Sequence, residues 1–197
     1  MQIFPLHRFN VTKTAKTFNQ LISNLDESSI LKVHDFSENY TCLLPEEAHS
    51  LHWTQETATV YPVVVLRKVD GVVREDHLVF VSDDKKHDVP FVERCNELIH
   101  QYYLEEGLSI THDIEYNDGC ASQFKCIRAF VSLARRPRKT TRVFTETSHG
   151  KSKSDGLGGV VKSYASRAVC GEGIIIRNVG ELVQFYNAYM IAKGCNN

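Results

Sequence analysis

The spacing of hydrophobic residues along the chain predicts an alternation of helices and strands. Residues 10–25 repeat apolar side chains every three or four positions, as one face of a helix does, whereas residues 59–68 form a nearly continuous apolar run typical of a central strand. Asp70 and the glycine after it mark a hairpin turn. In chain order we expect a helix over 10–25, strands over 30–36, 59–68 and 72–82, a helix over 89–104, a strand over 108–117, a helix over 120–134, a strand over 140–145, a helix from 155, a short strand-like piece over 174–176 and a helix over 179–191.

This order of elements suits a single α/β domain spanning residues 1–197, with residues 1–29 as a helical lead-in. We expect a mixed sheet of about five strands with helices on both of its faces. Neither an internal repeat nor a low-complexity linker interrupts the pattern.

The strand over 108–117 alternates apolar with polar residues. Four apolar residues share one side of it: Leu108, Ile110, Ile114 and Tyr116. Asp113 and Glu115 lie on the other, polar side, but Asp118 continues the apolar side. Because an unpaired buried charge costs several kcal/mol, such an acid needs a cation or a hydrogen-bond network as partner. The simpler alternative is that Asp118 and the following glycine only form a turn.

Asp35 repeats this arrangement on the strand over 30–36, where Leu31 and Val33 set the apolar side. If the two strands are parallel neighbours, Asp35 and Asp118 lie side by side. Like charges that close repel unless a divalent cation lies between them. Oxygen ligands without a Cys or His pattern favour Mg²⁺ or Mn²⁺ over zinc.

A third acid would complete a two-metal site of the kind used in phosphodiester chemistry. Asp155 is the favoured candidate, because Gly158 and Gly159 share its helix face and would let that helix approach the sheet closely. Asp155 could instead be only an N-cap residue. Glu146, just beyond the preceding strand, is the alternative third acid.

Three segments resemble the catalytic core of eukaryotic DDE/D-type DNA transposases. They are HDFSENY at 34–40, NDGCASQFK at 117–125 and TSHGKSKSDGLGGVVK at 147–162. The separation of 37 residues between Asp118 and Asp155 is also similar to that between the last two acids of many such enzymes.

The resemblance implies a ribonuclease H-like fold and metal-dependent cleavage or strand transfer of DNA, a reaction of transposable elements. It maps the catalytic, metal-binding acids onto Asp35, Asp118 and Asp155, with two Mg²⁺ or Mn²⁺ ions as cofactors. It further implies DNA as the partner and a nuclear location, and it leaves a homo-oligomer open. The resemblance covers the core alone, since such transposases carry an additional DNA-binding domain.

Supporting roles follow for a few polar residues. Gln123 and Lys125 would lie on the first turns of the helix after the second acid and could contact phosphate, and His149 and Lys151 could orient the scissile phosphate. For each of these, an exposed polar side chain without a role is the alternative. Trp53 could stack on a base, although a place in the core suits it better.

Charge is unevenly distributed. The chain has a net charge of −1, yet residues 125–168 carry +9 and the remainder carries −10. Such asymmetry suggests a polyanionic partner, although the acidic half could simply balance the basic half across the fold. The densest basic cluster, which we expect to contact the DNA backbone, is Arg135, Arg136, Arg138 and Lys139.

Several other classes find no support in the sequence. The six cysteines include no CxxC pair, and the histidines near Cys42 match no familiar zinc spacing. No apolar run approaches the ~20 residues that cross a membrane, and the N-terminus lacks signal-peptide features, so we expect an intracellular protein. A nucleotide-binding oxidoreductase would need a GxGxxG turn after a strand. The rival hypothesis is a domesticated, catalytically idle module that binds nucleic acid or protein.

Overall fold

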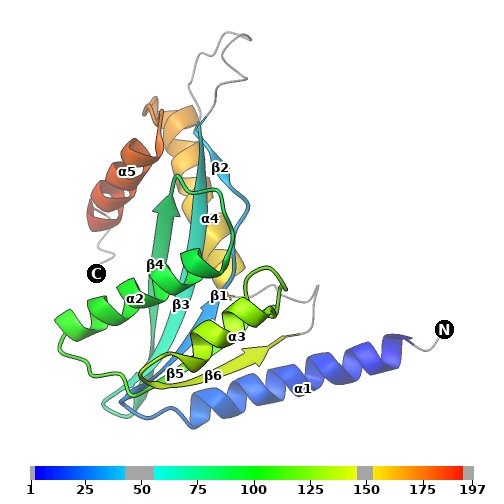
Figure 1. Cartoon of the computed structure of the whole chain (residues 1–197). Coiled ribbons are helices and arrows are strands. Elements are labelled where there is room, and N and C mark those ends of the chain that lie inside the picture. Colours follow the sequence, from blue (N-terminus) through cyan, green and yellow to red (C-terminus); the bar gives the residue numbers. More distant parts are fainter. Residues whose placement is uncertain (1–2, 43–55, 146–152, 193–197) are drawn as a thin grey trace. The chain divides into compact units, whose positions relative to one another are not determined.

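A computed structural model describes residues 3–42, 56–145 and 153–192 of the chain (Figure 1). The side chains it describes are those of residues 12–42, 56–145 and 153–189. The helices are α1 (Ile3–Ser23), α2 (Val89–Glu105), α3 (Ile127–Ala134), α4 (Lys153–Glu172) and α5 (Val179–Ala192). The strands are β1 (Ser29–His34), β2 (Tyr40–Thr41), β3 (Thr57–Val69), β4 (Val72–Ser82), β5 (His112–Asn117) and β6 (Lys139–Phe144).

The strands form one mixed sheet of six strands in the described part of the chain. Its order is β2-β3-β1-β5-β6, and β4 pairs with β3. β1 runs antiparallel to β3 but parallel to β5, and β5 runs parallel to β6. The expected α/β class and mixed sheet are therefore confirmed.

The chain divides into two compact units, and β3, β4 and α4 contribute to both. The first unit contains residues 1–35, 63–78 and 86–155. In it, α1 runs along one side of β5 and β6 (Figure 1). Its apolar face packs on the sheet through a cluster made of Phe18, Leu21, Ile22, Leu25, Leu31, Leu66, Ile114 and Tyr116. This cluster uses the apolar side that the alternation in β5 predicts.

The second unit contains residues 36–62, 79–85 and 156–197. Its core joins the start of β3 and the end of β4 to α4 and α5, and includes Tyr40, Cys42, Ala58, Val60, Ala165, Ala168, Val169, Ile176, Leu182 and Phe185. Cys42 packs here as a small buried side chain, as a reduced thiol does.

Local sequence signals account for several boundaries. Asp70 and Gly71 both have positive φ, as the tight turn between β3 and β4 requires, and β4 has the bounds that its sequence predicts. Asp88 caps α2 by accepting a hydrogen bond from the backbone N–H of Phe91. Gly107, with φ of +79°, ends that helix.

Two of the expected elements differ from the structure. The helix expected from residue 120 begins only at Ile127, because residues 120–126 form a turn in which the Cys120 carbonyl accepts from the backbone N–H of Phe124, whose side chain is fully buried. The segment 174–176 is not a strand. Its apolar content serves the core of the second unit, where Ile176 is fully buried.

Candidate functional site

Asp35 and Asp118 follow directly after β1 and β5, two adjacent parallel strands of the first unit. The register pairs Ser29 with His112, an offset of 83 residues, and the same offset relates Asp35 to Asp118. The two acids therefore occupy equivalent positions at the carboxyl ends of neighbouring strands, and both side chains are partly exposed. This is where ligand sites form in open α/β sheets.

The backbone turns sharply after β5. The side chain of Asn117 accepts a hydrogen bond from the N–H of Gly119 (3.2 Å), and that of Asp118 accepts from the N–H of Cys120 (2.9 Å). Asp118 therefore does form a turn, as the simpler interpretation of its sequence predicts. One of its carboxylate oxygens is used in this hydrogen bond, which fixes the direction of the side chain.

Gly119 has a φ of +73° and lies under the side chain of Lys125. A Cβ at this position would lie 2.5 Å from Cε of Lys125 and 3.1 Å from the ring of Phe144. The Lys125 ammonium lies 4.7 Å from the centroid of that ring. Glycine thus allows the lysine to lie across the turn that carries the second acid.

Asp155 lies in the first turn of α4 and is exposed. The helix begins at Lys153, whose side chain forms an ion pair with Glu75 of β4. Asp155 is therefore the third residue of the helix and not its N-cap. A Cβ on Gly158 would lie 3.0 Å from the Ser37 hydroxyl oxygen, so this glycine does permit a close approach; Gly159 has open space around it.

Among the described side chains, no three or more His, Cys, Asp and Glu residues are grouped so that they could hold a metal ion. Glu146, His149 and Lys151 lie outside the described residues, as does Trp53.

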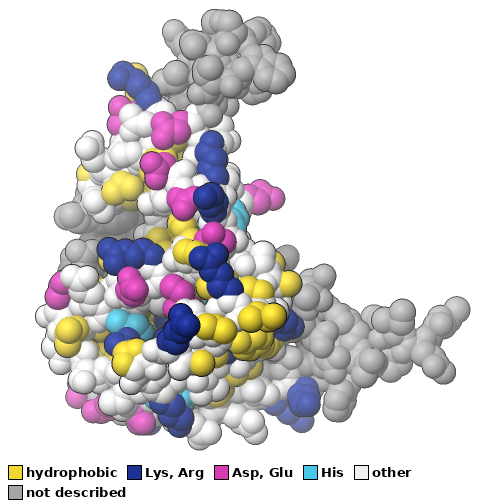
Figure 2. Space-filling view, viewed as in Figure 1, with side chains coloured by type: hydrophobic (Ala, Val, Ile, Leu, Met, Phe, Trp, Pro, Cys, Tyr) yellow, Lys and Arg dark blue, Asp and Glu magenta, His cyan; other side chains and the backbone are white. Residues whose placement is uncertain are grey.

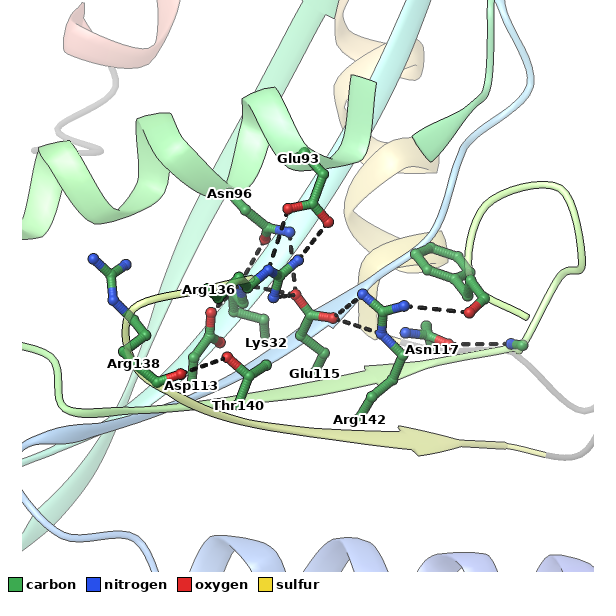
Figure 3. A network of polar contacts seen from close by, with 12 residues as sticks. Lys32, Glu93, Asn96, Asp113, Glu115, Asn117, Arg136, Arg138, Thr140 and Arg142 are labelled. Carbon is green, nitrogen blue, oxygen red and sulfur yellow. Dashed lines mark hydrogen bonds and ion pairs between the residues drawn. The ribbon is translucent and has the colours of Figure 1, made fainter. Parts of the chain in front are cut away.

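A buried network of charged side chains lies beside this turn, on the side of β5 and β6 that faces away from α1 (Figure 3). Its centre is Lys32 of β1, whose ammonium lies 2.7 Å from Asp113 and 3.5 Å from Glu115, with all three side chains fully buried. The ammonium also donates to the side-chain oxygen of Asn96 from α2, and the amide nitrogen of Asn96 donates to Glu115.

Two arginines complete the network. Arg136 forms paired contacts with Glu93 of α2 and a 2.6 Å contact with Glu115. Arg142 of β6 donates to the other oxygen of Glu115 (2.8 Å) and to the backbone carbonyl of Phe124 (3.2 Å). Three cations, Lys32, Arg136 and Arg142, therefore balance three carboxylates, Glu93, Asp113 and Glu115. Because Arg142 also holds the carbonyl of Phe124, the network braces the turn after Asp118.

The electrostatics of the network favour its charged state. Burial by itself would raise the pKa of Glu115, but Lys32 and Arg136 hold that pKa well below its ordinary value. Burial also opposes ionisation of Asp113, and Lys32 and a 2.9 Å contact with His100 still lower its pKa. His34 is buried beside them, and burial lowers its pKa to about 4. This histidine is therefore neutral at pH 7.

Pattern reasoning missed this network, because alternation in β5 suggests that Asp113 and Glu115 face solvent. Both are instead fully buried, since α2 covers that face of the sheet as well. One signal was available: Lys32 interrupts an apolar strand and is itself fully buried. A lysine there requires acidic partners from another strand.

The predicted phosphate-contacting residues lie in different environments. Lys125, Arg135 and Lys139 are exposed, and Arg138 is half-buried. Arg136 was wrongly assigned to this group: its side chain is 10% exposed, and its guanidinium is occupied by Glu93 and Glu115.

Gln123 is buried and lies in the turn before α3, not on a helix. Its side-chain oxygen has no hydrogen-bond partner among the described atoms. Lys125 lies in the same turn and not on a helical turn as expected.

No helix among the described residues has both the length and the apolar character required to span a bilayer.

Comparisons with known proteins give one match. Neither a curated protein nor a solved structure is significantly similar to the chain. The model of one family, described as "Domain of unknown function (DUF8701)", matches residues 14–192, which include both acids at the strand ends and the whole of the buried network. The chain therefore belongs to the DUF8701 family of domains.

Proposed function

We propose that this domain is a metal-dependent phosphodiester transferase that cleaves or joins DNA, with a ribonuclease H-like fold. The observation that carries the proposal is the equivalent placement of Asp35 and Asp118 at the ends of two parallel strands. Two carboxylates so placed offer hard oxygen ligands, which suit Mg²⁺ or Mn²⁺.

The arrangement of strands supports the finer fold assignment. An antiparallel hairpin, β3 and β4, lies on one side of β1, and the parallel strands β5 and β6 lie on the other. Helices follow β4, β5 and β6 in the chain. This is the order of elements on which the resemblance to transposase cores rests.

Each residue has a role in this proposal. Asp35 and Asp118 would hold the metal, and Asp155, from the same compact unit, is the proposed third acid. Bound Mg²⁺ or Mn²⁺ would activate a water or a 3′-hydroxyl and stabilise the leaving oxygen. Lys125, exposed beside the turn, would attract a phosphate of the DNA backbone.

The buried network has a supporting role. It connects β1, β5, β6 and α2 with fully or largely buried ion pairs, and it reaches the turn of the second acid through Arg142 and the carbonyl of Phe124. A ligand-bearing turn must be held closely to its productive geometry, and buried charge pairs around it restrict its movement.

The test compares Asp118→Asn with the wild type. The asparagine retains a side-chain oxygen for the N–H of Cys120, so the turn and the fold should survive. With Mg²⁺ or Mn²⁺ the wild type should nick plasmid DNA or join DNA ends, and the variant should lose this activity. Metal should also raise the melting temperature of the wild type more than that of the variant, since a ligand that binds only the native state stabilises it.

Asp70→Asn is the matched control, because it removes an exposed carboxylate from the β3-β4 turn and leaves the carboxyl ends of β1 and β5 unchanged. It should cleave and respond to metal as the wild type does. If millimolar Mn²⁺ shifts no melting curve and no DNA tested is cleaved, the enzyme proposal fails. The domain would then be a catalytically idle binding module.

A further inference from the structure

The helix α3 presents its large apolar side chains to solvent. Figure 2 shows hydrophobic side chains gathered over α3, with Lys and Arg at the margin. Ile127 is 84% exposed, Phe130 48% and Val131 42%. On its inner side, Ala129 is the one fully buried residue that α3 contributes. The helix is thus covered by little of the protein on its most apolar side.

The exposed residues have the spacing of a docking face. Ile127, Phe130, Val131 and Ala134 occupy positions i, i+3, i+4 and i+7, which lie along one side of a helix. Phe144 of β6 extends the apolar surface, with its ring centroid 6.5 Å from that of Phe130. Contiguous apolar surface of this kind marks interaction sites on soluble proteins.

The margin of this face is basic. Arg128 and Arg135 are exposed one position after Ile127 and Ala134, so both border the apolar stripe. Lys125, stacked on Phe144, adds a third positive charge. Residues 119–145 contain no Asp or Glu, and no carboxylate of the described residues forms an ion pair with Arg128, Arg135 or Lys125.

We infer that the outer face of α3 is the docking site for an acidic amphipathic helix of a partner protein. An apolar centre with a charged rim is the usual composition of such an interface, and helix-in-groove partners present apolar anchors at these intervals. DNA phosphates could neutralise the rim but would leave Ile127 and Phe130 uncovered. A symmetric pair of this chain would bring the basic margins of the two copies, each with Arg128 and Arg135, towards each other.

The inference does not depend on the proposed DNA chemistry. To test it, displayed random peptides are selected on the whole chain and counter-selected on the double variant Ile127→Ser, Phe130→Ser. Both residues are exposed, so the double variant should stay folded. Enriched peptides should carry apolar residues at helical spacing with Asp and Glu beside them.

The best peptide is then synthesised and titrated by fluorescence anisotropy. The double variant should weaken its binding tenfold or more, because central apolar anchors dominate such interfaces. Arg128→Glu with Arg135→Glu should also weaken it, whereas Leu104→Ser, which removes an exposed apolar residue from α2, should not.

Three results would overturn the inference. The first is a selection that yields no peptide preferring the wild type, or only basic ones. The second is self-association in sedimentation that the double variant abolishes, which would make this face a contact between copies. The third is oligonucleotide binding that is lost in the double variant while the peptide's binding is unchanged, which would assign the face to DNA.

Discussion

Replacing Lys32 by methionine tests whether the buried network is as tightly coupled as its geometry indicates. Methionine keeps much of the volume and the apolar stem but removes the ammonium that contacts Asp113 and Glu115. Glu115 retains Arg136 and Arg142, whereas Asp113 is left with His100. Burial lowers the pKa of His100, so this histidine supplies little positive charge at neutral pH.

The expected loss of unfolding free energy is about 3–5 kcal/mol, the usual result of removing one partner from a buried ion pair. Whole domains are stable by only about 5–15 kcal/mol, so the effect would be large. Urea denaturation at pH 7 measures it as a lower midpoint with an unchanged slope. Lys139→Met removes an exposed lysine and should change stability by no more than about 0.5 kcal/mol.

The pH dependence gives an independent check. In the wild type the lowered pKa values of Asp113 and Glu115 stabilise the fold above about pH 4.5, and this stability is lost as the pH falls further. Without Lys32, burial should instead raise the pKa of Asp113 above 3.8. Acidification then protonates Asp113 in the variant and removes the cost of burying its unpaired charge.

The difference in unfolding free energy between Lys32→Met and the wild type should therefore shrink from pH 7 towards pH 4. Adding Asp113→Asn to the Lys32→Met variant should restore part of the lost stability. A loss below about 1 kcal/mol, or a difference independent of pH, would show that the network is not a coupled unit.

Two further predictions concern residues near the second acid. Because burial lowers the pKa of His34 from 6.5 to about 4, the unfolded chain binds more protons between these values, and stability should rise with pH by about 3 kcal/mol from pH 4 to 7. His34→Gln should lack this component in denaturation series across pH, and an unchanged slope would contradict the assignment. Gly119→Ala should cost about 1–2 kcal/mol of stability for its positive φ, and in addition the contact between Lys125 and Phe144. Thermal unfolding should therefore show a larger loss than for Gly71→Ala, since Gly71 also has a positive φ but has open space where the new Cβ would lie. Equal losses in the two variants would mean that the lysine contact contributes nothing.

The sequence by itself determined the elements whose signals are local. Apolar periodicity located α2, β4 and the long central strand β3, because side chains that share a face recur at the period of the element. Asp70 and Gly71 marked the hairpin turn, and Gly107 marked the end of α2, because all three positions have a positive φ. Of the two acids, Asp118 lies at the end of its strand as the sequence predicts, whereas Asp35, expected on the strand over 30–36, follows directly after β1. That they are register neighbours follows from a pairing over 83 residues that no local pattern contains.

The tertiary structure alone decided which polar side chains are buried. Alternation in β5 distinguishes two faces, but it does not reveal that α2 covers the polar one, with Asn96 against Glu115 and Glu93 against Arg136. Likewise, the helix expected from residue 120 begins only at Ile127, because the segment before it forms a turn that contains the fully buried Phe124. Lys32 shows the common physical reason. A buried charge is tolerable only where distant segments deliver its partners, and Asn96 and Asp113 lie 64 and 81 residues away in the chain.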